Sequence, residues 1–385
     1  MLSALIKQEE KRQQETVNLI ASENYPSEAV RMAVGSVLSS KYAEGYPGKR
    51  YYSGTKFVDE IETTVQDLAR KVFTTDYHVN VQPYSGSIAN LAAYLSFMQP
   101  GDPIMSLDLA HGGHLSHGHK VNFVGKLFDR YAYFVEADSH RLDYDTIEEE
   151  ATELKPKIIV SGASAYSRQI DFKRISDIAH SVGARHLADI SHISGLVTTG
   201  LHPTPFPSTS SGQAAADYVM TTTHKLLRGP RGALLFCKPE FAKEIDKSVF
   251  PGLQGGPQMN TIAGIGVCLE EALMPEYKIY CQQVIKNAQA LATELQKLGL
   301  KVITDGTDNH LFLVDLRPLN ITGQEAQDRL ENIGITVNKN AIPYDEAPPQ
   351  NPSGIRIGTP AITTRGLTEK DLPALAKKIV EALKQ

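Results

Sequence analysis

The chain has few cysteines, no long apolar run and no excess of positive charge. Its 385 residues include three cysteines, Cys237, Cys268 and Cys281. They form no CxxC pair and have no histidine at metal-ligand spacing, so we expect reduced thiols rather than a disulfide framework or a zinc site. No stretch reaches the roughly 18 apolar residues of a membrane span, and the charged N-terminal segment 1–20 lacks the apolar core of a signal peptide. We therefore expect a cytoplasmic protein without a membrane partner.

The charge balance argues against a nucleic-acid partner. Lysine and arginine number 39 against 44 aspartates and glutamates, giving a formal net charge of -5 that is spread along the chain. No basic face follows from such a distribution. The length exceeds the roughly 250–300 residues at which single cores stop growing, so two domains are expected.

Apolar and amphipathic segments alternate from about residue 60 to residue 240. The pattern predicts helices at 61–73, 85–98 and 175–184, and strands at 103–108, 157–162, 185–191, 218–223 and 232–237. Such alternation is typical of an α/β domain with a largely parallel sheet and crossover helices. The Pro/Ser-rich segment 203–213 is predicted to be a loop.

The last third of the chain has the pattern of a second, smaller unit. We predict a long helix from residue 261 that continues past Pro275 to about residue 300, then strands at 301–304, 310–316 and 335–338 and helices at 323–334 and 368–385. The predicted organisation is an N-terminal helix and interface segment (1–55), a large domain (56–270) and a small C-terminal domain (271–385).

A Ser-Gly-Ser turn, residues 85–87, opens one of the predicted helices. The free backbone N–H groups and the positive dipole end of a helix N-terminus favour a phosphate or carboxylate, and the hydroxyls of Ser85 and Ser87 add donors. Gly86 between them lets the backbone turn. The alternative is an ordinary N-cap without a ligand.

Two other polar residues follow predicted strands, where open α/β sheets bind their ligands. Asp189 ends an apolar strand, and its carboxylate can pair with the protonated ring nitrogen of a ligand; helix capping is the alternative. Lys225 follows the strand 218–223 beside His224 and Arg231. A desolvated lysine near other cations has a lowered pKa, and its neutral amine can form a Schiff base; a solvated surface lysine is the alternative.

These features together indicate one cofactor. A phosphate cup, a strand-end carboxylate and a buried lysine are what a pyridoxal-phosphate site requires. The histidine-rich segment 111–119 adds an imidazole for stacking on a flat ring, with Gly112 and Gly113 allowing the backbone to approach a ligand closely. No metal site is predicted there, because the histidines are spaced three residues apart on a glycine-broken segment.

Eight sequence blocks, in order along the chain, resemble those of serine hydroxymethyltransferases. They are "LIASENY" (19–25), "KYAEGYPGKRYY" (41–52), "LAHGGHLSHG" (109–118), "TTTHKLLRGPRG" (221–232), "FPGLQGGP" (250–257), "GTDNHLFLVDL" (306–316), "ITVNKN" (335–340) and "SGIRIGTPA" (353–361). Since they run from residue 19 to residue 361, the resemblance covers nearly the whole chain.

The resemblance implies a fold and an activity. The fold is that of the fold-type I, aspartate-aminotransferase-like, pyridoxal-phosphate-dependent transferases: an α/β large domain with a seven-stranded, mostly parallel sheet and a smaller C-terminal α/β domain. The expected assembly is a homodimer with active sites at the interface. The expected reaction, in one-carbon metabolism and amino-acid biosynthesis, transfers the serine hydroxymethyl group reversibly to tetrahydrofolate. It proceeds through an external aldimine with pyridoxal phosphate and gives glycine and 5,10-methylenetetrahydrofolate.

The resemblance also implies roles for matching residues. Lys225 carries the cofactor, His224 beside it tunes substrate choice, Asp189 pairs with the ring nitrogen and His114 stacks on the ring. The other cofactor contacts are Ser164 and His192 near the 3-hydroxyl, Ser85, Gly86 and Ser87 at the phosphate, and Gly255 and Gly256 of the partner subunit.

At the substrate end, the resemblance assigns the amino-acid carboxylate to Arg356. Ser22 and Tyr42 of the partner subunit lie near that carboxylate, and Arg231 positions Tyr42. Glu44 is the acid/base group at the hydroxymethyl and folate end. Positions that match the folate pocket are Tyr51, Tyr52, Leu109, Gly113, Leu115 and Asn340.

Two alternatives remain at the level of sequence. A folate-independent β-hydroxy-amino-acid (threonine or allothreonine) aldolase, or an α-methylserine-type relative, would use the same cofactor. It is suggested by the segment 347–354, which lacks the phenylalanine often found before "SGIR", whereas Glu44, the paired tyrosines and Asn340 favour folate. A catalytically idle cofactor-binding protein would predict loss of Lys225, Arg356 or Glu44, and all three are present.

Overall fold

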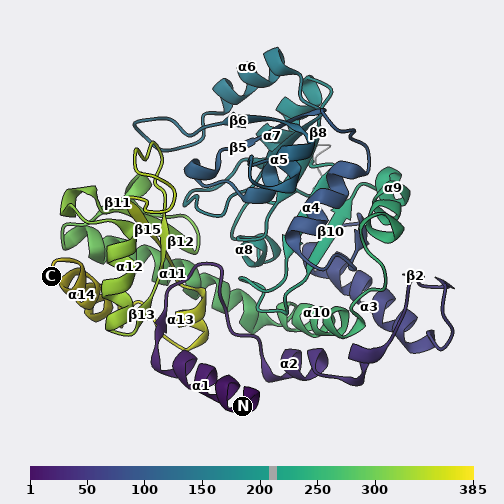
Figure 1. The fold of residues 1–385 in the computed structure, drawn as a ribbon, viewed down its shortest axis with the longest axis horizontal. Helices are drawn as coiled ribbons and strands as arrows, with labels where there is room; N and C mark the ends of the chain where they lie inside the picture. The colour runs from purple at the N-terminus through teal and green to yellow at the C-terminus, as the bar shows by residue number, and fades with distance from the viewer. Residues whose placement is uncertain (208–214) are drawn as a thin grey trace.

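A seven-stranded sheet forms the centre of the computed structural model, which describes residues 1–207 and 215–385 (Figure 1). The strand order is β4-β10-β9-β8-β7-β5-β6, and only β10 runs antiparallel to its neighbours. The strands are β4 (His78–Asn80), β5 (Pro103–Leu107), β6 (Asp129–Tyr133), β7 (Ile158–Ser161), β8 (Arg185–Asp189), β9 (Tyr218–Thr222) and β10 (Ala233–Cys237). The predicted seven-stranded, mostly parallel sheet is confirmed.

Helices cover both faces of this sheet, which explains why its inner strands are apolar without alternation. Along β8, Ala188 packs into the core on one face and Leu187 into the core on the other. The first face is covered by α3 (Lys56–Phe73), α6 (Tyr144–Leu154), α7 (Phe172–Ser181), α8 (Ser194–Thr198) and α10 (Met259–Ala272). The second is covered by α4 (Gly86–Leu95), α5 (Phe123–Leu127) and α9 (Ala242–Lys247).

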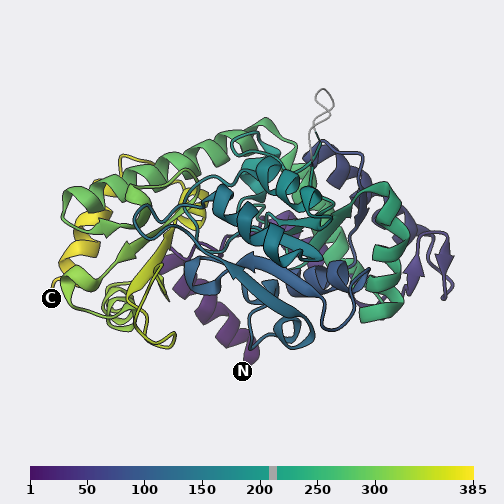
Figure 2. The ribbon, with the colours of Figure 1, turned by 90° about the horizontal axis from the view of Figure 1, so that it is seen from above.

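A smaller antiparallel sheet lies beside the large one, at the left of Figure 2. Its order is β11-β12-β15-β14, with β11 (Lys301–Val302), β12 (Leu311–Asp315), β14 (Asn338–Asn340) and β15 (Gly354–Gly358). It shares a core with α12 (Gly323–Asn332), α13 (Pro360–Thr364) and α14 (Leu372–Leu383). The helix α11 (Pro275–Lys297) contributes Val284 to the large core and Leu291 to the small one, so it connects the two.

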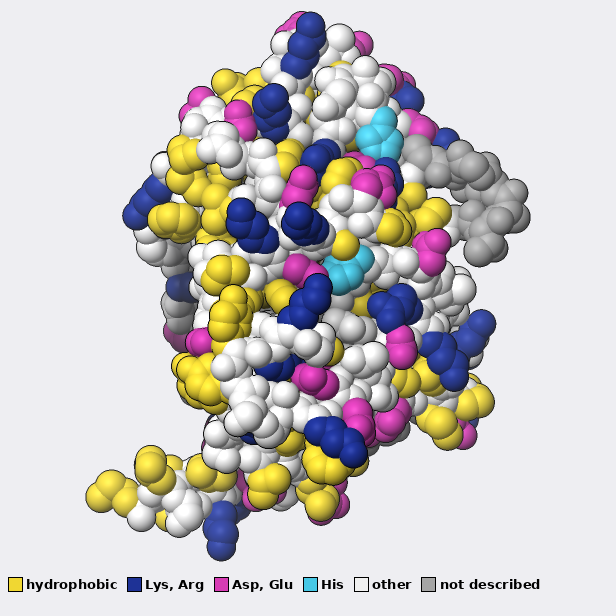
Figure 3. All heavy atoms as spheres, turned by 90° about the vertical axis from the view of Figure 1, so that its right-hand side faces the viewer, with side chains coloured by type: hydrophobic (Ala, Val, Ile, Leu, Met, Phe, Trp, Pro, Cys, Tyr) yellow, Lys and Arg dark blue, Asp and Glu magenta, His cyan; other side chains and the backbone are white. Residues whose placement is uncertain are grey.

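The N-terminal segment runs along the molecule without a core of its own. Its strand β1 (Val17–Asn18) pairs with β13 (Ile335–Thr336), whereas α2 (Glu28–Val34) packs on α10. The hairpin β2 (Gly45–Tyr46) and β3 (Lys49–Arg50) follows. The first helix, α1 (Leu2–Glu15), has no buried residue and leaves Leu2, Leu5 and Ile6 at least half exposed. It projects at the lower left of Figure 3 with hydrophobic side chains in view.

Some predicted elements differ in the structure. The predicted continuous helix from 261 to 300 is wrong: α10 ends at Ala272 and α11 begins at Pro275. Proline favours the first helical position and forces the preceding residue to an extended conformation, which Met274 adopts at ψ 142°. The predicted strand 335–338 is divided between β13 and β14, and the strand 301–304 ends at Val302. The predicted loop 203–213 falls partly on residues 208–214, outside the described residues.

A buried ion pair holds the hairpin that follows Glu44. The guanidinium of Arg50 donates to the Glu62 carboxylate at 2.6 Å and to the carbonyls of Ala43 and Gly45 at 2.9 and 2.8 Å. The side chains of Arg50 and Glu62 are 2% and 0% exposed. Gln82 donates to both Glu62 and the carbonyl of Gly45, so the backbone on either side of Glu44 is fixed by this network.

Breaking this pair is expected to destabilise the protein. The Glu62→Ala substitution leaves Asp59 as the remaining carboxylate partner of Arg50 and removes the acceptor of one buried N–H group, which typically costs about 1–3 kcal/mol. Urea titration should show this loss in the free energy of unfolding. The exposed neighbour Glu60 supplies a matched control, because Glu60→Ala removes a solvated carboxylate of the same helix. Equal stability of the two variants would contradict a structural role for the pair.

Candidate active site

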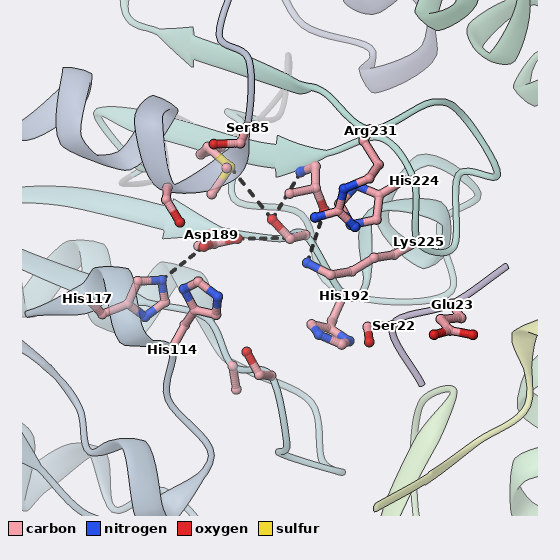
Figure 4. Close-up of a pocket in the computed structure, with 17 residues that line it drawn as sticks. Ser22, Glu23, Ser85, His114, His117, Asp189, His192, His224, Lys225 and Arg231 are labelled. Carbon is pink, nitrogen blue, oxygen red and sulfur yellow. Dashed lines mark hydrogen bonds and ion pairs between the residues drawn. The ribbon is translucent and has the colours of Figure 1, made fainter. Parts of the chain in front are cut away.

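A polar cavity of about 310 Å³ opens at the carboxyl ends of the parallel strands (Figure 4). This is the edge at which open α/β sheets bind ligands. The lining residues are Ser22, Glu23, Ser85, Gly86, Ser87, His114, His117, Ala163, Ser164, Asp189, Ser191, His192, Met220, Thr222, His224, Lys225 and Arg231. The structure therefore brings together eleven residues that the sequence analysis had assigned to one site.

Lys225 extends into this cavity from the turn that follows β9. Its Nζ donates to Thr222 Oγ1 at 3.1 Å, and Figure 4 shows the ammonium pointing toward the centre of the cavity. Burial lowers the pKa of Lys225 from 10.5 to about 8; the Asp189 carboxylate opposes this, and the charges of Arg356 and Arg231 add to it. Lys225 thus lies in a desolvated position near other cations, and with a pKa of about 8 about one amine in ten is neutral at pH 7.

Asp189 ends β8 and is held by three donors. Its Oδ2 accepts from His117 Nε2 at 2.9 Å and from Asn90 Nδ2 at 3.1 Å, while Oδ1 accepts from the Ser191 backbone N–H at 3.0 Å. Burial alone would raise the pKa of this carboxyl, but the His117 hydrogen bond and the nearby positive groups bring it well below its ordinary value. The cavity therefore contains a fixed negative charge, which suits a protonated ring nitrogen.

Two imidazoles of this cavity, those of His114 and His224, are neutral near physiological pH. Burial lowers the pKa of His114 to about 4, and burial together with the charge of Lys225 lowers that of His224 to about 3. His114 accepts from the Ser116 backbone N–H through Nδ1 at 3.2 Å, which fixes its ring at the cavity wall. A neutral, fixed ring at a cavity wall is suited to stacking on a flat ligand.

The side of the cavity formed by the first turn of α4 is suited to anions. Ser85 is the N-cap of α4, and its Oγ accepts from the Ile88 backbone N–H at 3.4 Å. The other N–H groups of this first turn and the hydroxyl of Ser87 remain as donors at the positive end of the helix. The N-cap interpretation and the phosphate-site interpretation thus describe the same turn and do not exclude one another.

Arg356, on β15, reaches the same region from the small sheet. It donates through Nε to Asn338 Oδ1 at 3.0 Å, through Nη1 to the Ser164 carbonyl at 2.6 Å and through Nη2 to Ser22 Oγ at 3.4 Å. Burial lowers the pKa of Arg356 to about 10, so the guanidinium stays charged at neutral pH. A buried, oriented guanidinium is the group best suited to a carboxylate.

One expectation about this region is wrong, and a second feature has a further explanation. Ser22 was expected from the partner subunit, but it lies in the cavity of its own chain against Arg356. Gly112 and Gly113 were expected to let the backbone approach a ligand. A Cβ on Gly112 would lie 2.8 Å from the Ala165 carbonyl oxygen, and one on Gly113 would lie 2.2 Å from that of Leu107, so close backbone packing within the protein already requires both glycines.

A second group of predicted residues lies elsewhere. Tyr42, Gly255 and Gly256 line a separate cavity of about 310 Å³. Glu44 lies near it, since a Cβ on Gly255 would be 3.2 Å from its Oε1. Tyr52 packs on Tyr42 at a centroid distance of 4.9 Å, and Tyr51 packs on Phe250 at 5.8 Å. Within the described part of the chain, none of these residues lines the cavity around Lys225.

The predicted folate residues also lie outside the lining of the Lys225 cavity, as far as the described residues show. Leu109 begins the short 3₁₀ helix Leu109–His111, and Gly113 packs against the end of β5. Leu115 is 41% exposed. Asn340 ends β14, two residues after the Asn338 that contacts Arg356.

Sequence reasoning missed several members of the site. The contact of His117 with Asp189 joins residues 72 positions apart, and that of Asn90 with Asp189 joins residues 99 apart. Glu23 and Met220 also line the cavity. Only His117 carried a usable signal, because it follows His114 by three residues in a segment already expected near the ligand.

The family of the chain follows from its sequence. The family model described as serine hydroxymethyltransferase matches residues 1–379 of the 385. The chain belongs to the serine hydroxymethyltransferase family. It is a pyridoxal-phosphate-dependent one-carbon transferase, which interconverts serine and tetrahydrofolate with glycine and 5,10-methylenetetrahydrofolate. The alternative of a folate-independent aldolase is not favoured by this match.

The residues around Lys225 fit pyridoxal phosphate. The amine suits the aldehyde, Asp189 suits the ring nitrogen, and the first turn of α4 suits the phosphate. A Cβ on Gly86 would lie 2.7 Å from Thr222 Cγ2, so glycine is needed to bring this turn against β9. His224 Nδ1 is buried and has no hydrogen-bond partner among the described residues, which leaves it available for a bound group.

The lowered pKa of Lys225 predicts how fast the cofactor attaches at different pH values. Only the neutral amine attacks an aldehyde, and with a pKa of about 8 about one lysine in ten is neutral at pH 7, against about one in three thousand at the ordinary value. The attachment rate of pyridoxal phosphate to the cofactor-free protein should rise up to about pH 8 and level off above about pH 9. A rate that still rises steeply to pH 10 would contradict the lowered pKa.

Proposed function

We propose that the cavity around Lys225 is the catalytic site of this hydroxymethyltransferase and that Lys225 carries the cofactor. The observation that supports this most directly is the position of a lysine with a pKa of about 8 opposite the buried Asp189 carboxylate. Asp189 keeps the ring nitrogen protonated, His114 stacks on the ring, and Ser85, Gly86 and Ser87 bind the phosphate. His192 and Ser164 lie near the 3-hydroxyl.

The substrate amino acid is held between the two sheets in this proposal. Arg356 binds its carboxylate through two N–H groups, with Ser22 beside them. The bound cofactor supplies a sink for the electron pair released at the substrate α-carbon. His224, next to Lys225, limits the space for the substrate side chain.

The remaining groups come from a second subunit. Glu44 of the partner subunit takes and returns the proton of the substrate hydroxymethyl oxygen. Tyr42 of the partner subunit lies near the substrate carboxylate and is positioned by Arg231. Gly255 and Gly256 of the partner subunit complete the phosphate site. Tetrahydrofolate binds across the positions Tyr51, Tyr52, Leu109, Gly113, Leu115 and Asn340. Two observations support this dimer: Tyr42 and Glu44 lie apart from Lys225 within one chain, and α1 exposes hydrophobic side chains.

Mixing two inactive variants tests the shared site. Lys225→Ala and Glu44→Gln each damage both sites of a homodimer. A hybrid of the two has one intact site, because the Glu44→Gln subunit supplies Lys225 and the other subunit supplies Glu44. Random exchange of subunits should restore roughly a quarter of wild-type activity. A mixture that stays as inactive as its components would show that Glu44 serves the Lys225 of its own chain.

The cellular setting and the domain boundaries complete the proposal. No helix among the described residues is long and apolar enough to cross a bilayer. We assign the enzyme to the cytoplasm on the basis of its family and its few, unpaired cysteines. We divide the enzyme into an N-terminal segment (1–55), a large domain (56–270) and a small domain (271–385). The helix α11 packs on the cores of both domains.

A further inference from the structure

Two buried histidines from different parts of the fold contact each other behind the cavity. His192 follows β8 and lines the cavity, whereas His310 precedes β12 of the small sheet. His192 Nδ1 and His310 Nε2 lie 3.2 Å apart, and the two side chains are 5% and 0% exposed. Among the described residues that line the cavity, His192 is present and His310 is not, so the hydrogen bond between them is the contact through which His310 can orient a cavity group.

Both rings are neutral, which limits how the proton between them can be placed. Burial, reinforced by the charges of Lys225 and Arg356, lowers the pKa of His192 far below its ordinary value, and burial lowers that of His310 to about 3. A neutral imidazole has one N–H group and one lone pair. One of the two facing nitrogens must therefore donate and the other must accept.

The other nitrogen of His310 decides between the two arrangements. His310 Nδ1 is buried and has no hydrogen-bond partner among the described residues. If His192 donated, His310 would accept through Nε2 and carry its own proton on Nδ1, as a buried N–H without an acceptor. If His310 donates from Nε2, only a lone pair is left without a partner. Orphaned buried N–H groups are rarer in proteins than under-satisfied acceptors, so the second arrangement is favoured.

We propose that His310 is a positioning residue that donates to His192 Nδ1 and thereby fixes His192 as the tautomer with its proton on Nε2. His192 then presents an N–H donor to the cavity, and its acceptor is the 3-oxygen of the cofactor ring. This inference rests on the proposed function for the identity of the ligand, whereas the tautomer itself follows from the protein alone. Because His310 directly precedes β12 of the small sheet, the donor is correctly oriented only when the two sheets are packed as observed.

The tautomer can be tested without activity. Ring-¹⁵N NMR of the full-length enzyme, as purified and after cofactor removal, distinguishes the two nitrogens of a neutral histidine. The His192 signals are identified by their loss in His192→Asn. We expect the Nε2–H tautomer in both samples. The Nδ1–H tautomer for His192 would overturn the proposal, and this measurement does not depend on any variant of His310.

Substitution of His310 tests the consequence for the cofactor. His310→Gln keeps an N–H donor at similar reach, whereas His310→Met fills the space without one. The Met variant is expected to bind pyridoxal phosphate about tenfold more weakly than wild type, the usual effect of one lost hydrogen bond, and the Gln variant within about threefold of wild type. Equal affinities of the two variants, whether high or low, would overturn the proposal.

A control separates this effect from loss of packing. His186 is equally buried, bonds to Ser161 Oγ and Ser176 Oγ at 2.7 Å each, and does not line the cavity. His186→Met should lower stability without changing cofactor affinity. Borohydride reduction followed by peptide mapping of the wild type shows whether the cofactor is attached to Lys225. Failure of that mapping would reject the proposed function, while the NMR result would still decide the His310 proposal.

Discussion

Replacing Lys225 with alanine is expected to lower kcat for serine cleavage by about 10⁴-fold or more, the scale seen when an enzyme loses its covalent catalytic group. The buried amine is the only lysine that lines the cavity among the described residues, and it faces Asp189. No other side chain of the lining can bond covalently to an aldehyde as an amine does. The measurement is the steady-state rate with serine and tetrahydrofolate at saturating cofactor.

The same variant should keep part of its affinity for the cofactor. The phosphate turn of α4, His114 and Asp189 are unchanged, so pyridoxal phosphate should bind without forming the Schiff base that borohydride reduces to a permanent link to the protein. Lys238 offers a matched control, since it also follows a strand, is half-buried and pairs with Asp217 outside the cavity. Lys238→Ala should keep wild-type turnover. Persistent labelling of the protein at another lysine in Lys225→Ala would show that the attachment site is elsewhere.

The large sheet was predictable from sequence because its inner strands are buried on both faces. Runs such as 157–162 and 232–237 are apolar without alternation, which only a covered strand tolerates. The strands that were missed lack this signal. β6 is an edge strand whose residues alternate between exposed and covered positions, and β4 has only three residues. β15 includes two glycines and Arg356, a composition typical of a loop, yet every one of its residues is buried.

The active site was predictable to the extent that its residues follow strands. Asp189 and Lys225 lie at strand ends, and one edge of a parallel sheet brings all such ends together. Contacts that depend on packing between distant segments gave no signal. Ser22 and Arg356 are separated by 334 positions, and the assignment of Ser22 to a partner subunit was wrong because sequence order does not show which chain folds back on which sheet.

The second large effect is expected at Arg356. Its guanidinium is buried, charged and oriented by Asn338, so replacing it with alanine removes a preformed site for the substrate carboxylate. Loss of a buried charge-assisted pair typically costs about 3–5 kcal/mol, so kcat/KM for serine should fall by about 10²–10³-fold or more. Arg356→Lys should recover only a small part, because an ammonium cannot reproduce two parallel N–H groups.

The loss at Arg356 should be confined to the substrate. Lys225 and the phosphate turn are untouched, so attachment of the cofactor, followed by borohydride reduction, should proceed to the same extent as in wild type. Arg317 is a matched control: it follows β12 of the same small sheet, pairs with Asp315 and is not among the described residues that line the cavity. Arg317→Lys should leave kcat/KM within about twofold, because it keeps the positive charge of a pair that does not line the cavity. If Arg356→Lys retained wild-type kcat/KM, the substrate carboxylate would have to be bound by another group. Arg231 would then be the next candidate, because it lines the cavity on the side of His224.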